Sequence, residues 1–414
     1  MSKQISTKPF YNTEIPDDWS ISHLGELGVF SKGKGILKEQ VIEEGLPCIR
    51  YGEIYTTHDF IIKNFKSFIN DDLAKESKEI KKGDILFAGS GETVEEIGKA
   101  VAYLGNEKAY AGGDVIILST KKDVDAECLS YILETDFVRR QKRVLGQGNS
   151  VVHIYSSDLS KVKIPLPPLP EQKAIAKVLT TWDEAITKTQ TLINQKELSK
   201  KWLMQNLLTG KKRLKGFGGE WKEMHIRDVA KEVSIRNKSD KQLTVLSCTK
   251  YDGLVPSLEY FGRKIFADDV STYKIVPKNH FAYATNHIEE GSIGYQENFD
   301  EALISPMYTV FKTNGSVDDT FFYRLLKSYP LVYQYQNRME GSIDRRGGLR
   351  WDAFSIIKLK LPFIEEQTAI AQVLQAADKE INLLKAKAEK LREQKKGLMQ
   401  QLLTGKQRLN ISKK

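Results

Sequence analysis

The chain has 414 residues, with 63 lysines and arginines against 54 aspartates and glutamates, which gives a formal net charge of +9. A moderate positive excess favours a polyanionic partner without identifying one, and the length supports two or three domains. The three cysteines, Cys48, Cys128 and Cys248, form no C-x-x-C pair, which argues against a disulfide framework and a thiolate zinc site. With no secretion signal and no run of membrane-spanning length, we expect a cytoplasmic protein without a membrane partner.

Residues 1–163 are predicted to form a first globular domain. Short β-rich runs at 84–88, 100–104 and 115–118 are separated by glycine-containing turns. Residues 125–144 are predicted to form a helix with a basic end, followed by a glycine-rich loop at 146–150. This pattern is typical of a mixed α+β domain.

Residues 164–215 contain a stretch that recurs, without a gap, in residues 361–414. The run Glu171–Leu179 matches Glu366–Leu374, and the segment ending in Leu-Leu-Thr-Gly-Lys is also repeated. A duplication of this length indicates a duplicated structural unit.

Each copy is predicted to form one long helix, on the order of 55 Å at 1.5 Å per residue. Apolar residues recur at alternating steps of three and four, which is typical of a coiled-coil seam. Lys200 and Lys395 occupy the same position of this seam in the two copies. Because the ends of a compact domain usually lie close together, we expect the two helices to pair with each other in antiparallel orientation.

Residues 216–360 are predicted to form a second α+β domain. Its opening around Trp221 resembles the opening of the first domain around Trp19, and its close at 354–362 resembles residues 159–167. The interiors of the two domains scarcely resemble each other. Similar frames with different interiors suggest two domains with one task and different targets.

The sequence offers no catalytic or metal-binding constellation. The run Gly91–Ala100 has the wrong spacing for a phosphate loop, and Ala100 stands where Ser or Thr should meet magnesium. The six histidines include no H-x-x-x-H pair on a predicted helix. We therefore predict a chain with no catalytic residues, no bound metal and no cofactor of its own.

The remaining signal is a set of basic, polar and aromatic residues in predicted loops, of the types that read base edges or neutralise phosphates. Any one of them is more often an ordinary solvated surface residue. The candidates for DNA contact are Lys32, Lys34, Arg50, Tyr51, Ser90, Arg139, Arg143, Gln147 and Asn149 in the first domain, and Arg236, Lys250, Tyr251, Asn286, His287, Arg345, Arg346 and Arg350 in the second.

The whole chain resembles the specificity subunits of type I restriction–modification systems. The resemblance rests on two divergent α+β domains, each followed by a Pro-x-x-x-Glu-Gln-x-Ala-Ile-Ala helix that ends in Leu-Leu-Thr-Gly-Lys. It implies two target-recognition domains that each read one half of a bipartite double-stranded DNA sequence, and two helices that form a pseudo-twofold spacer.

The resemblance also implies partners. These are methyltransferase subunits, expected in two copies, which use S-adenosylmethionine, and motor-nuclease subunits, which use ATP and Mg. We expect the repeated helices to dock these partners through exposed residues, for which the candidates are Gln172, Gln205, Lys211, Gln367, Gln400 and Lys406.

Two other hypotheses remain open at this stage. The chain could be a coiled-coil adaptor that joins proteins, with its basic character incidental. It could also be a single-chain nuclease or methyltransferase, although the missing motifs argue against that. Electrophoretic mobility with duplex DNA would separate the adaptor from the DNA-recognition subunit.

Overall fold

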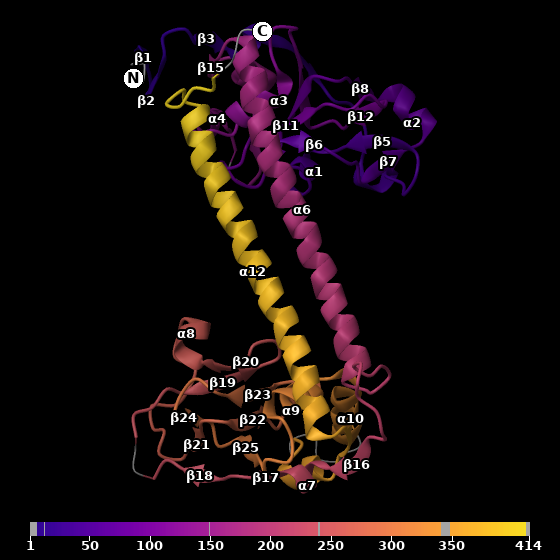
Figure 1. The fold of residues 1–414 in the computed structure, drawn as a ribbon. Coiled ribbons are helices and arrows are strands. Elements are labelled where there is room, and N and C mark those ends of the chain that lie inside the picture. Colours follow the sequence, from indigo (N-terminus) through magenta and orange to yellow (C-terminus); the bar gives the residue numbers. More distant parts are fainter. Residues whose placement is uncertain (1–5, 12, 149, 239–240, 341–347, 411–414) are drawn as a thin grey trace. The chain divides into compact units, whose positions relative to one another are not determined.

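The computed structural model describes residues 6–11, 13–148, 150–238, 241–340 and 348–410, and the structural statements below concern these residues. The chain divides into two compact units, shown in Figure 1. Unit 1 contains residues 1–189 and 387–414, and unit 2 contains residues 190–386. Each unit therefore includes one part of each long helix. No helix of the described chain is both long enough and apolar enough to cross a membrane.

Unit 1 is built around a sheet with the strand order β4-β13-β9-β11-β6. Its strands are β4 (Gly28–Lys32), β6 (Ile61–Ile62), β9 (Asp84–Ala88), β11 (Ala100–Tyr103) and β13 (Val115–Thr120). The pairs are antiparallel except β11 with β6, which is parallel. A second sheet contains β5 (Leu46–Ile49), β7 (Ser67–Ile69), β8 (Lys78–Ile80) and β12 (Ala109–Ala111). Every residue of β9 and β11 is buried, which fits their apolar composition.

The remaining elements of unit 1 are short. The helices are α1 (Tyr51–Thr56), α2 (Asp71–Glu76), α3 (Ala126–Ile132), α4 (Asp136–Leu145) and α5 (Ser156–Leu159), with 3-10 turns η1 (Leu24–Glu26) and η2 (Lys38–Gln40). The strands are β1 (Thr7–Phe10) paired with β2 (Thr13–Pro16), and β10 (Ser90–Gly91) paired with β14 (Val152–His153).

The single helix predicted over 125–144 is wrong, because the structure has α3 and α4 there. Thr135 has extended backbone angles and its hydroxyl donates to the carbonyl of Ile132. A threonine that satisfies a local carbonyl in this way ends one helix and starts the next.

Unit 2 contains a sheet in the order β17-β25-β22-β23, all antiparallel. Its strands are β17 (Ala230–Glu232), β22 (His280–Ala284), β23 (Ile293–Gln296) and β25 (Tyr308–Thr313). Beside it are β18 (Ile235–Arg236), β21 (Lys274–Pro277) and β24 (Glu301–Ile304) in one sheet and the hairpin of β19 (Leu246–Thr249) and β20 (Gly253–Pro256). The helical elements are α7 (Ile226–Val229), α8 (Ser257–Phe261), η3 (Ile288–Glu290), α9 (Asp319–Leu326), α10 (Tyr329–Glu340) and α11 (Trp351–Ser355).

The predicted common frame of the two domains is confirmed. In unit 1, β3 (Ser20–His23) pairs antiparallel with β15 (Lys163–Leu166), and in unit 2, β16 (Lys222–His225) pairs antiparallel with β26 (Lys358–Leu361). In both units the strand that follows the repeated tryptophan, Trp19 or Trp221, thus pairs with the strand that leads into a long helix. The predicted α+β fold class is confirmed as well.

The long helices are α6 (Leu169–Leu207) and α12 (Ile364–Leu402). Within unit 1, Asp183 of α6 pairs with Lys395 of α12, and Glu171 pairs with Arg408 beyond the end of α12. Within unit 2, Glu197 pairs with Lys385 and Lys200 with Asp378. Residue numbers rise along one helix as they fall along the other, so the predicted antiparallel pairing is confirmed within each unit.

The apolar positions of the predicted seam are all buried or half-buried. Ile175, Ile193 and Leu207 of α6 are buried, as are Ile370, Ile381, Ala388 and Leu402 of α12. The ends of the helices also join the cores of the globular parts, since Leu179 and Leu402 belong to one cluster with the strands of unit 1. The helices are therefore part of each unit rather than appendages to it.

Candidate nucleic-acid interface

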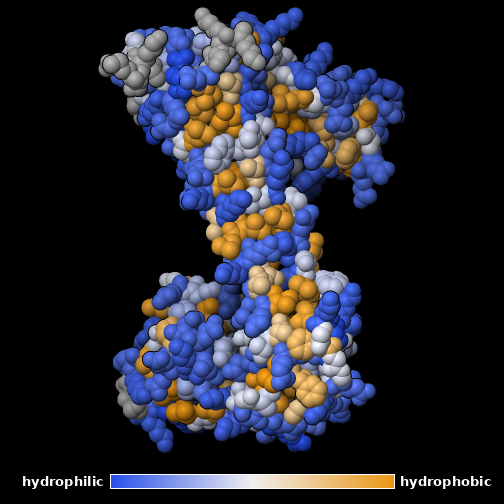
Figure 2. All heavy atoms as spheres, in the orientation of Figure 1, coloured by the Kyte–Doolittle hydropathy of each residue, from blue (hydrophilic) through white to orange (hydrophobic). Residues whose placement is uncertain are grey.

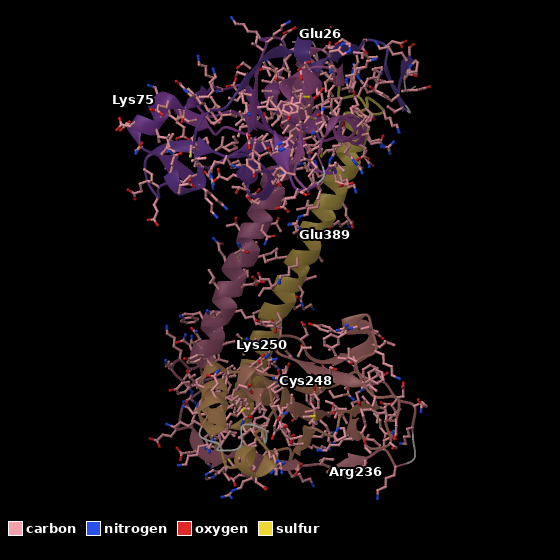
Figure 3. The ribbon with its side chains drawn as sticks, turned by 180° about the vertical axis from the view of Figure 1, so that it is seen from behind. Glu26, Lys75, Arg236, Cys248, Lys250 and Glu389 are labelled. Carbon is pink, nitrogen blue, oxygen red and sulfur yellow. The ribbon has the colours of Figure 1, made fainter. Side chains whose placement is uncertain are left out.

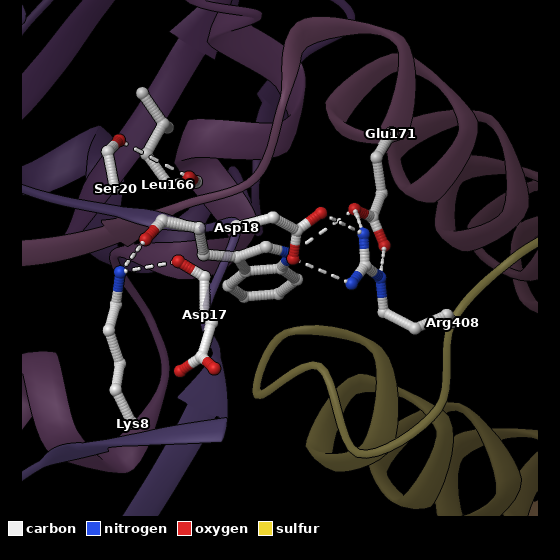
Figure 4. A network of polar contacts seen from close by, with 8 residues as sticks. Lys8, Asp17, Asp18, Ser20, Leu166, Glu171 and Arg408 are labelled. Carbon is white, nitrogen blue, oxygen red and sulfur yellow. Dashed lines mark hydrogen bonds and ion pairs between the residues drawn. The ribbon is translucent and has the colours of Figure 1, made fainter. Parts of the chain in front are cut away.

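The repeated motif anchors the end of one long helix to the start of the other within unit 1. Figure 4 shows the Arg408 guanidinium between two carboxylates. Its Nε and Nη2 lie 2.5 and 2.6 Å from the two oxygens of Glu171, and Nη1 and Nη2 lie 2.9 Å from those of Asp18. Glu171 is only 2% exposed and also accepts from Nε1 of Trp19 at 3.1 Å. A bidentate pair of this kind fixes orientation as well as position.

Unit 2 repeats this anchor with the other pair of helix ends. Nε of Arg213 lies 2.5 Å from Oε1 of Glu366, and the guanidinium also donates to the carbonyls of Gly218 and Gly219. Trp221 corresponds to Trp19, but in the described structure its Nε1 has no hydrogen-bond partner. The motif repeated in the sequence is thus a structural joint, used once in each unit.

The prediction that Gln172 and Gln367 are exposed docking residues is wrong. Both side chains are buried. Gln172 accepts from the backbone N–H of Asp125 at 2.8 Å and donates to the carbonyl of Pro167 at 2.8 Å. Gln367 does the same with Asp318 and Pro362, at 3.0 and 2.9 Å. A side-chain amide provides a donor and an acceptor at once, which explains why glutamine stands at this buried position in both copies.

The other docking candidates, Gln205, Gln400, Lys211 and Lys406, are exposed. Figure 2 shows that apolar side chains also reach the surface of the long helices. The exposed large apolar residues of these helices are Leu192, Leu198, Trp202, Ile364 and Leu383. Single exposed apolar residues are normal, so these positions alone do not define a docking surface.

In unit 1, part of the predicted DNA-contact set gathers around a cavity of about 770 Å³ at the start of α1. Arg50 and Tyr51 line it together with the glycine-rich turns at Gly35 and at Gly112–Gly113. Lys32 reaches the same rim, where its Nζ lies 3.7 Å from Asp114, and the backbone N–H of Lys34 donates to the carbonyl of Ala111. The structure therefore brings Lys32, Lys34, Arg50 and Tyr51 together.

Arg50 is the best-positioned cation of this group. Its backbone N–H donates to Oε2 of Glu53 at 2.9 Å, and its Nη2 lies 3.8 Å from Oε1 of the same carboxylate. Its Nε is buried and has no partner in the described structure. A guanidinium held by one carboxylate with donors left over can still form the bidentate contact that reads guanine.

The remaining described candidates of unit 1 lie on α4 and on or beside the antiparallel strand pair β10–β14. Ser90 is buried and its Oγ lies 2.9 Å from Nδ1 of His153, so its hydroxyl is not presented for contact as predicted. The backbone of Gln147 is paired with that of His153. Nη2 of Arg143 lies 2.9 Å from Glu95, and Nε of Arg139 lies 3.7 Å from Glu134. These arginines are therefore partly neutralised within the unit.

Lys142, in the basic run of α4, positions this region instead of facing a partner. It is buried, and its Nζ donates to the carbonyl of Gly98 at 2.8 Å and to Oε1 of Glu134 at 3.0 Å. Burial lowers the pKa of Lys142, and the neighbouring carboxylate of Glu134 opposes that shift. Its position in a basic run gave no sign of burial, because the sequence does not show that Gly98 folds back onto α4.

In unit 2, Asn286 and Arg350 line a cavity of about 400 Å³ together with Lys274, Tyr308 and Trp351. The backbone N–H of Leu349 donates to the carbonyl of Thr285 at 2.9 Å, which holds the two predicted loops side by side. His287 is exposed and its Nδ1 lies 3.9 Å from Glu290. Asn149, Arg345 and Arg346 lie outside the described residues.

The structure does not bring the other candidates of unit 2 to this cavity. Arg236 lies on β18, whereas Lys250 and Tyr251 form the turn between β19 and β20, and Figure 3 shows Arg236 and Lys250 at different ends of the unit. Tyr251 is 81% exposed, and Nζ of Lys250 lies 5.5 Å from its ring centre. An exposed aromatic ring beside a lysine can stack on a base or simply face solvent.

One group of potential metal ligands occurs in the described chain. The ligand atoms of His287, Glu289 and Glu290 lie within 4.8 Å of one another. They stand on one short turn and two of the three residues are exposed, so the group needs no ion to explain it.

Comparison with known proteins gives a consistent result. A family model described as the type I restriction modification DNA specificity domain matches residues 16–197 and again residues 218–393. The type I restriction enzyme MjaVIII specificity subunit of Methanocaldococcus jannaschii is 25% identical over 98% of this chain and 97% of its own length. The EcoKI specificity subunit of Escherichia coli is 26% identical over 44% of this chain and 40% of its own length.

Solved structures agree in fold. The S subunit of a type I restriction–modification system from M. genitalium has a TM-score of 0.56 and 17% identity, and the match covers 96% of this chain and 99% of that one. The HsdS subunit from Thermoanaerobacter tengcongensis has a TM-score of 0.54, 17% identity and the same coverage.

Proposed function

Since the chain belongs to the type I restriction modification DNA specificity family, we propose that it is the non-catalytic subunit that recognises DNA in a type I restriction–modification complex. Each unit would read one half of a bipartite target in double-stranded DNA. The observation that supports this most strongly is that two equivalent frames, β3–β15 and β16–β26, hold different loops. Different readers on one frame suit a target whose two halves differ in sequence.

We further propose that the long helices dock the other subunits. Two methyltransferase subunits, which use S-adenosylmethionine, would bind the two equivalent repeats, and motor-nuclease subunits, which use ATP and Mg, would join them. The exposed residues Gln205, Gln400, Lys211 and Lys406 stay candidates for these contacts. The complex would act in the cytoplasm, where reduced cysteines are expected.

A domain exchange tests the reading of two half-sites. Residues 15–160 are replaced by the corresponding domain of a relative with a different target, and methylated sites are mapped by sequencing genomic DNA. We expect one half of the recognised sequence to change and the other to persist. If both halves change, or if the wild-type complex selects no sequence, the proposal is wrong, and the second result would favour a protein adaptor.

The helices are also proposed to set the spacing between the half-sites. A seven-residue insertion after Gln195, matched by another after Leu383 on the facing turn of α12, keeps the antiparallel register that Glu197 and Lys385 define. We expect both half-sequences to persist and their separation to change. A control insertion after Gly315, in an exposed turn of unit 2, should leave the separation unaltered.

A further inference from the structure

One ion pair between the long helices occurs in both units, but its surroundings differ. In unit 1, Nζ of Lys395 lies 2.5 Å from Asp183, and the segment 57–66 lies beside this pair. Phe60 of that segment has its ring centre 4.0 Å from Nζ of Lys395 and 4.6 Å from the ring of Tyr131. The side chains of Lys395 and Asp183 are accordingly only 7% and 17% exposed. The chain itself thus places an aromatic residue, next to the carboxylate of Asp59, on the paired lysine.

In unit 2 the equivalent place is open. Lys200 pairs with Asp378, and their side chains are 28% and 31% exposed. Strand β6, which leads on from Phe60, has no counterpart in the sheet of unit 2 that the described residues form. Unit 1 has a smaller cavity of about 300 Å³ beside the segment 57–66, whereas unit 2 has one of about 710 Å³ at the matching place. Its lining includes Asp378, Ile381 and Asn382, which correspond to Asp183, Ile186 and Thr187 beside the segment of unit 1.

The lining of this cavity favours an anionic and aromatic occupant. It contains five lysines, namely Lys200, Lys201, Lys211, Lys327 and Lys385, against two carboxylates, those of Glu197 and Asp378. Ser328 also lines the cavity. It is only 7% exposed, and its Oγ has no hydrogen-bond partner in the described structure. An unsatisfied buried hydroxyl in a lysine-rich cavity is a donor available to a carboxylate.

An aromatic side chain would find matching surfaces there. Tyr329 lines the cavity, is 77% exposed and stacks on Tyr333 with ring centres 6.3 Å apart. Arg324 occupies the place of Tyr131: each donates to the paired aspartate, Arg324 to Asp378 at 2.6 Å and Tyr131 to Asp183 at 2.7 Å. A guanidinium can contact an aromatic ring, as the tilted ring of Tyr131 contacts Phe60.

We propose that the cavity of unit 2 receives a segment of the methyltransferase subunit that carries an aromatic side chain beside a carboxylate, and so fills the place that Asp59 and Phe60 fill in unit 1. The inference rests on the proposed function, because it takes the partner from it. The occupant is a protein segment rather than a nucleotide, because a segment of polypeptide occupies the matching position of unit 1. The two equivalent repeats therefore bind their partners unequally.

Matched substitutions on the two repeats test this inference. Lys201→Glu and Tyr329→Ala change the cavity, whereas Lys396→Glu changes the residue of α12 that corresponds to Lys201 but lies in unit 1. Binding of the purified methyltransferase subunit to the full-length chain is measured by isothermal titration calorimetry. We expect Lys201→Glu and Tyr329→Ala to weaken one binding event at least tenfold and Lys396→Glu to change neither event more than twofold. Equal weakening by Lys201→Glu and Lys396→Glu would overturn the inference, as would no weakening by either cavity variant.

Three further measurements keep the result specific. Ser328→Trp, which fills the cavity without removing a charge, should also weaken that event, and unchanged circular dichroism would show that the fold persists. ATP and S-adenosylmethionine are titrated into the chain alone, and binding that Tyr329→Ala abolishes would overturn the assignment to a protein segment. Sequence-specific DNA binding by the wild-type complex is measured in parallel. Absence of such binding would count against the proposed function. Normal DNA binding, together with cavity variants that bind the methyltransferase subunit as the wild type does, would count against this inference alone.

Discussion

The seam of unit 1 and the seam of unit 2 are built from duplicated helices, yet they are completed by residues that are not duplicated. Asp183 and Asp378 are repeats of each other, as are Lys395 and Lys200. The third partner comes from the divergent domain, as the hydroxyl of Tyr131 in unit 1 and the guanidinium of Arg324 in unit 2. The repeated helices therefore define the ion pair, while the domain packed on them determines how far that pair is shielded from water.

The largest effects on stability are expected at the arginine–glutamate joint, of which each unit contains one copy. Glu171→Ala leaves Arg408 with Asp18 alone and also removes the acceptor of Trp19, whereas Glu366→Ala leaves Arg213 with only backbone carbonyls. Removing one partner of a buried pair costs about 3 kcal/mol, so Glu171→Ala should lower the free energy of unfolding of unit 1 by that order, and Glu366→Ala should lower that of unit 2. Hydrogen exchange of the amides of α3 and α9 distinguishes the units. Equal loss of protection in both units after one substitution would show that they do not unfold separately.

A smaller contrast is expected at the seam lysines. Lys395→Met leaves Asp183 with only the hydroxyl of Tyr131, whereas after Lys200→Met the charge of Arg324 still compensates Asp378. Lys395 is also the more buried lysine, and burial lowers its pKa while Asp183 opposes that shift. We expect Lys395→Met to be more destabilising than Lys200→Met by about 1–2 kcal/mol in urea denaturation. A larger cost for Lys200→Met would contradict the shielding argument.

The sequence predicted the frame of the molecule better than its contacts, and the residues show why. The duplication predicted the two α+β domains and the antiparallel helices, because a heptad pattern and a repeated opening are local signals. It did not show that Gln172 and Gln367 face inward, because their partners, the N–H groups of Asp125 and Asp318, are some fifty residues away. Nor did it show that Lys142 is buried in a run of exposed cations, or that Phe60 covers Lys395. Those contacts depend on tertiary packing that no short window contains.

The pH dependence of unit 2 should reveal the pair at Asp378. Burial alone would raise the pKa of Asp378, but hydrogen bonds from Lys200 and Arg324 outweigh it and hold the pKa below the ordinary value of 3.8. The ionised carboxylate therefore stabilises the folded state above pH 3.8, and this contribution is lost as the pH falls through the lowered pKa. The difference in unfolding free energy between the wild type and Asp378→Asn should shrink as the pH is lowered from 5 towards 3. A difference independent of pH would mean that the charge of Asp378 does not contribute.

The smallest contrast concerns the two tryptophans of the common frame. Nε1 of Trp19 donates to the buried carboxylate of Glu171, whereas Nε1 of Trp221 is buried without a partner in the described structure. Phenylalanine keeps an aromatic ring and removes the N–H, so Trp19→Phe loses a hydrogen bond to a charged group, worth about 1.5 kcal/mol or more. Trp221→Phe removes an unsatisfied donor, and that gain offsets part of the lost packing. We therefore expect Trp221→Phe to lower the free energy of unfolding less than Trp19→Phe does in paired urea titrations. The reverse order would show that the packing of Trp221 against Gly210 contributes more to stability than its unpaired Nε1 costs.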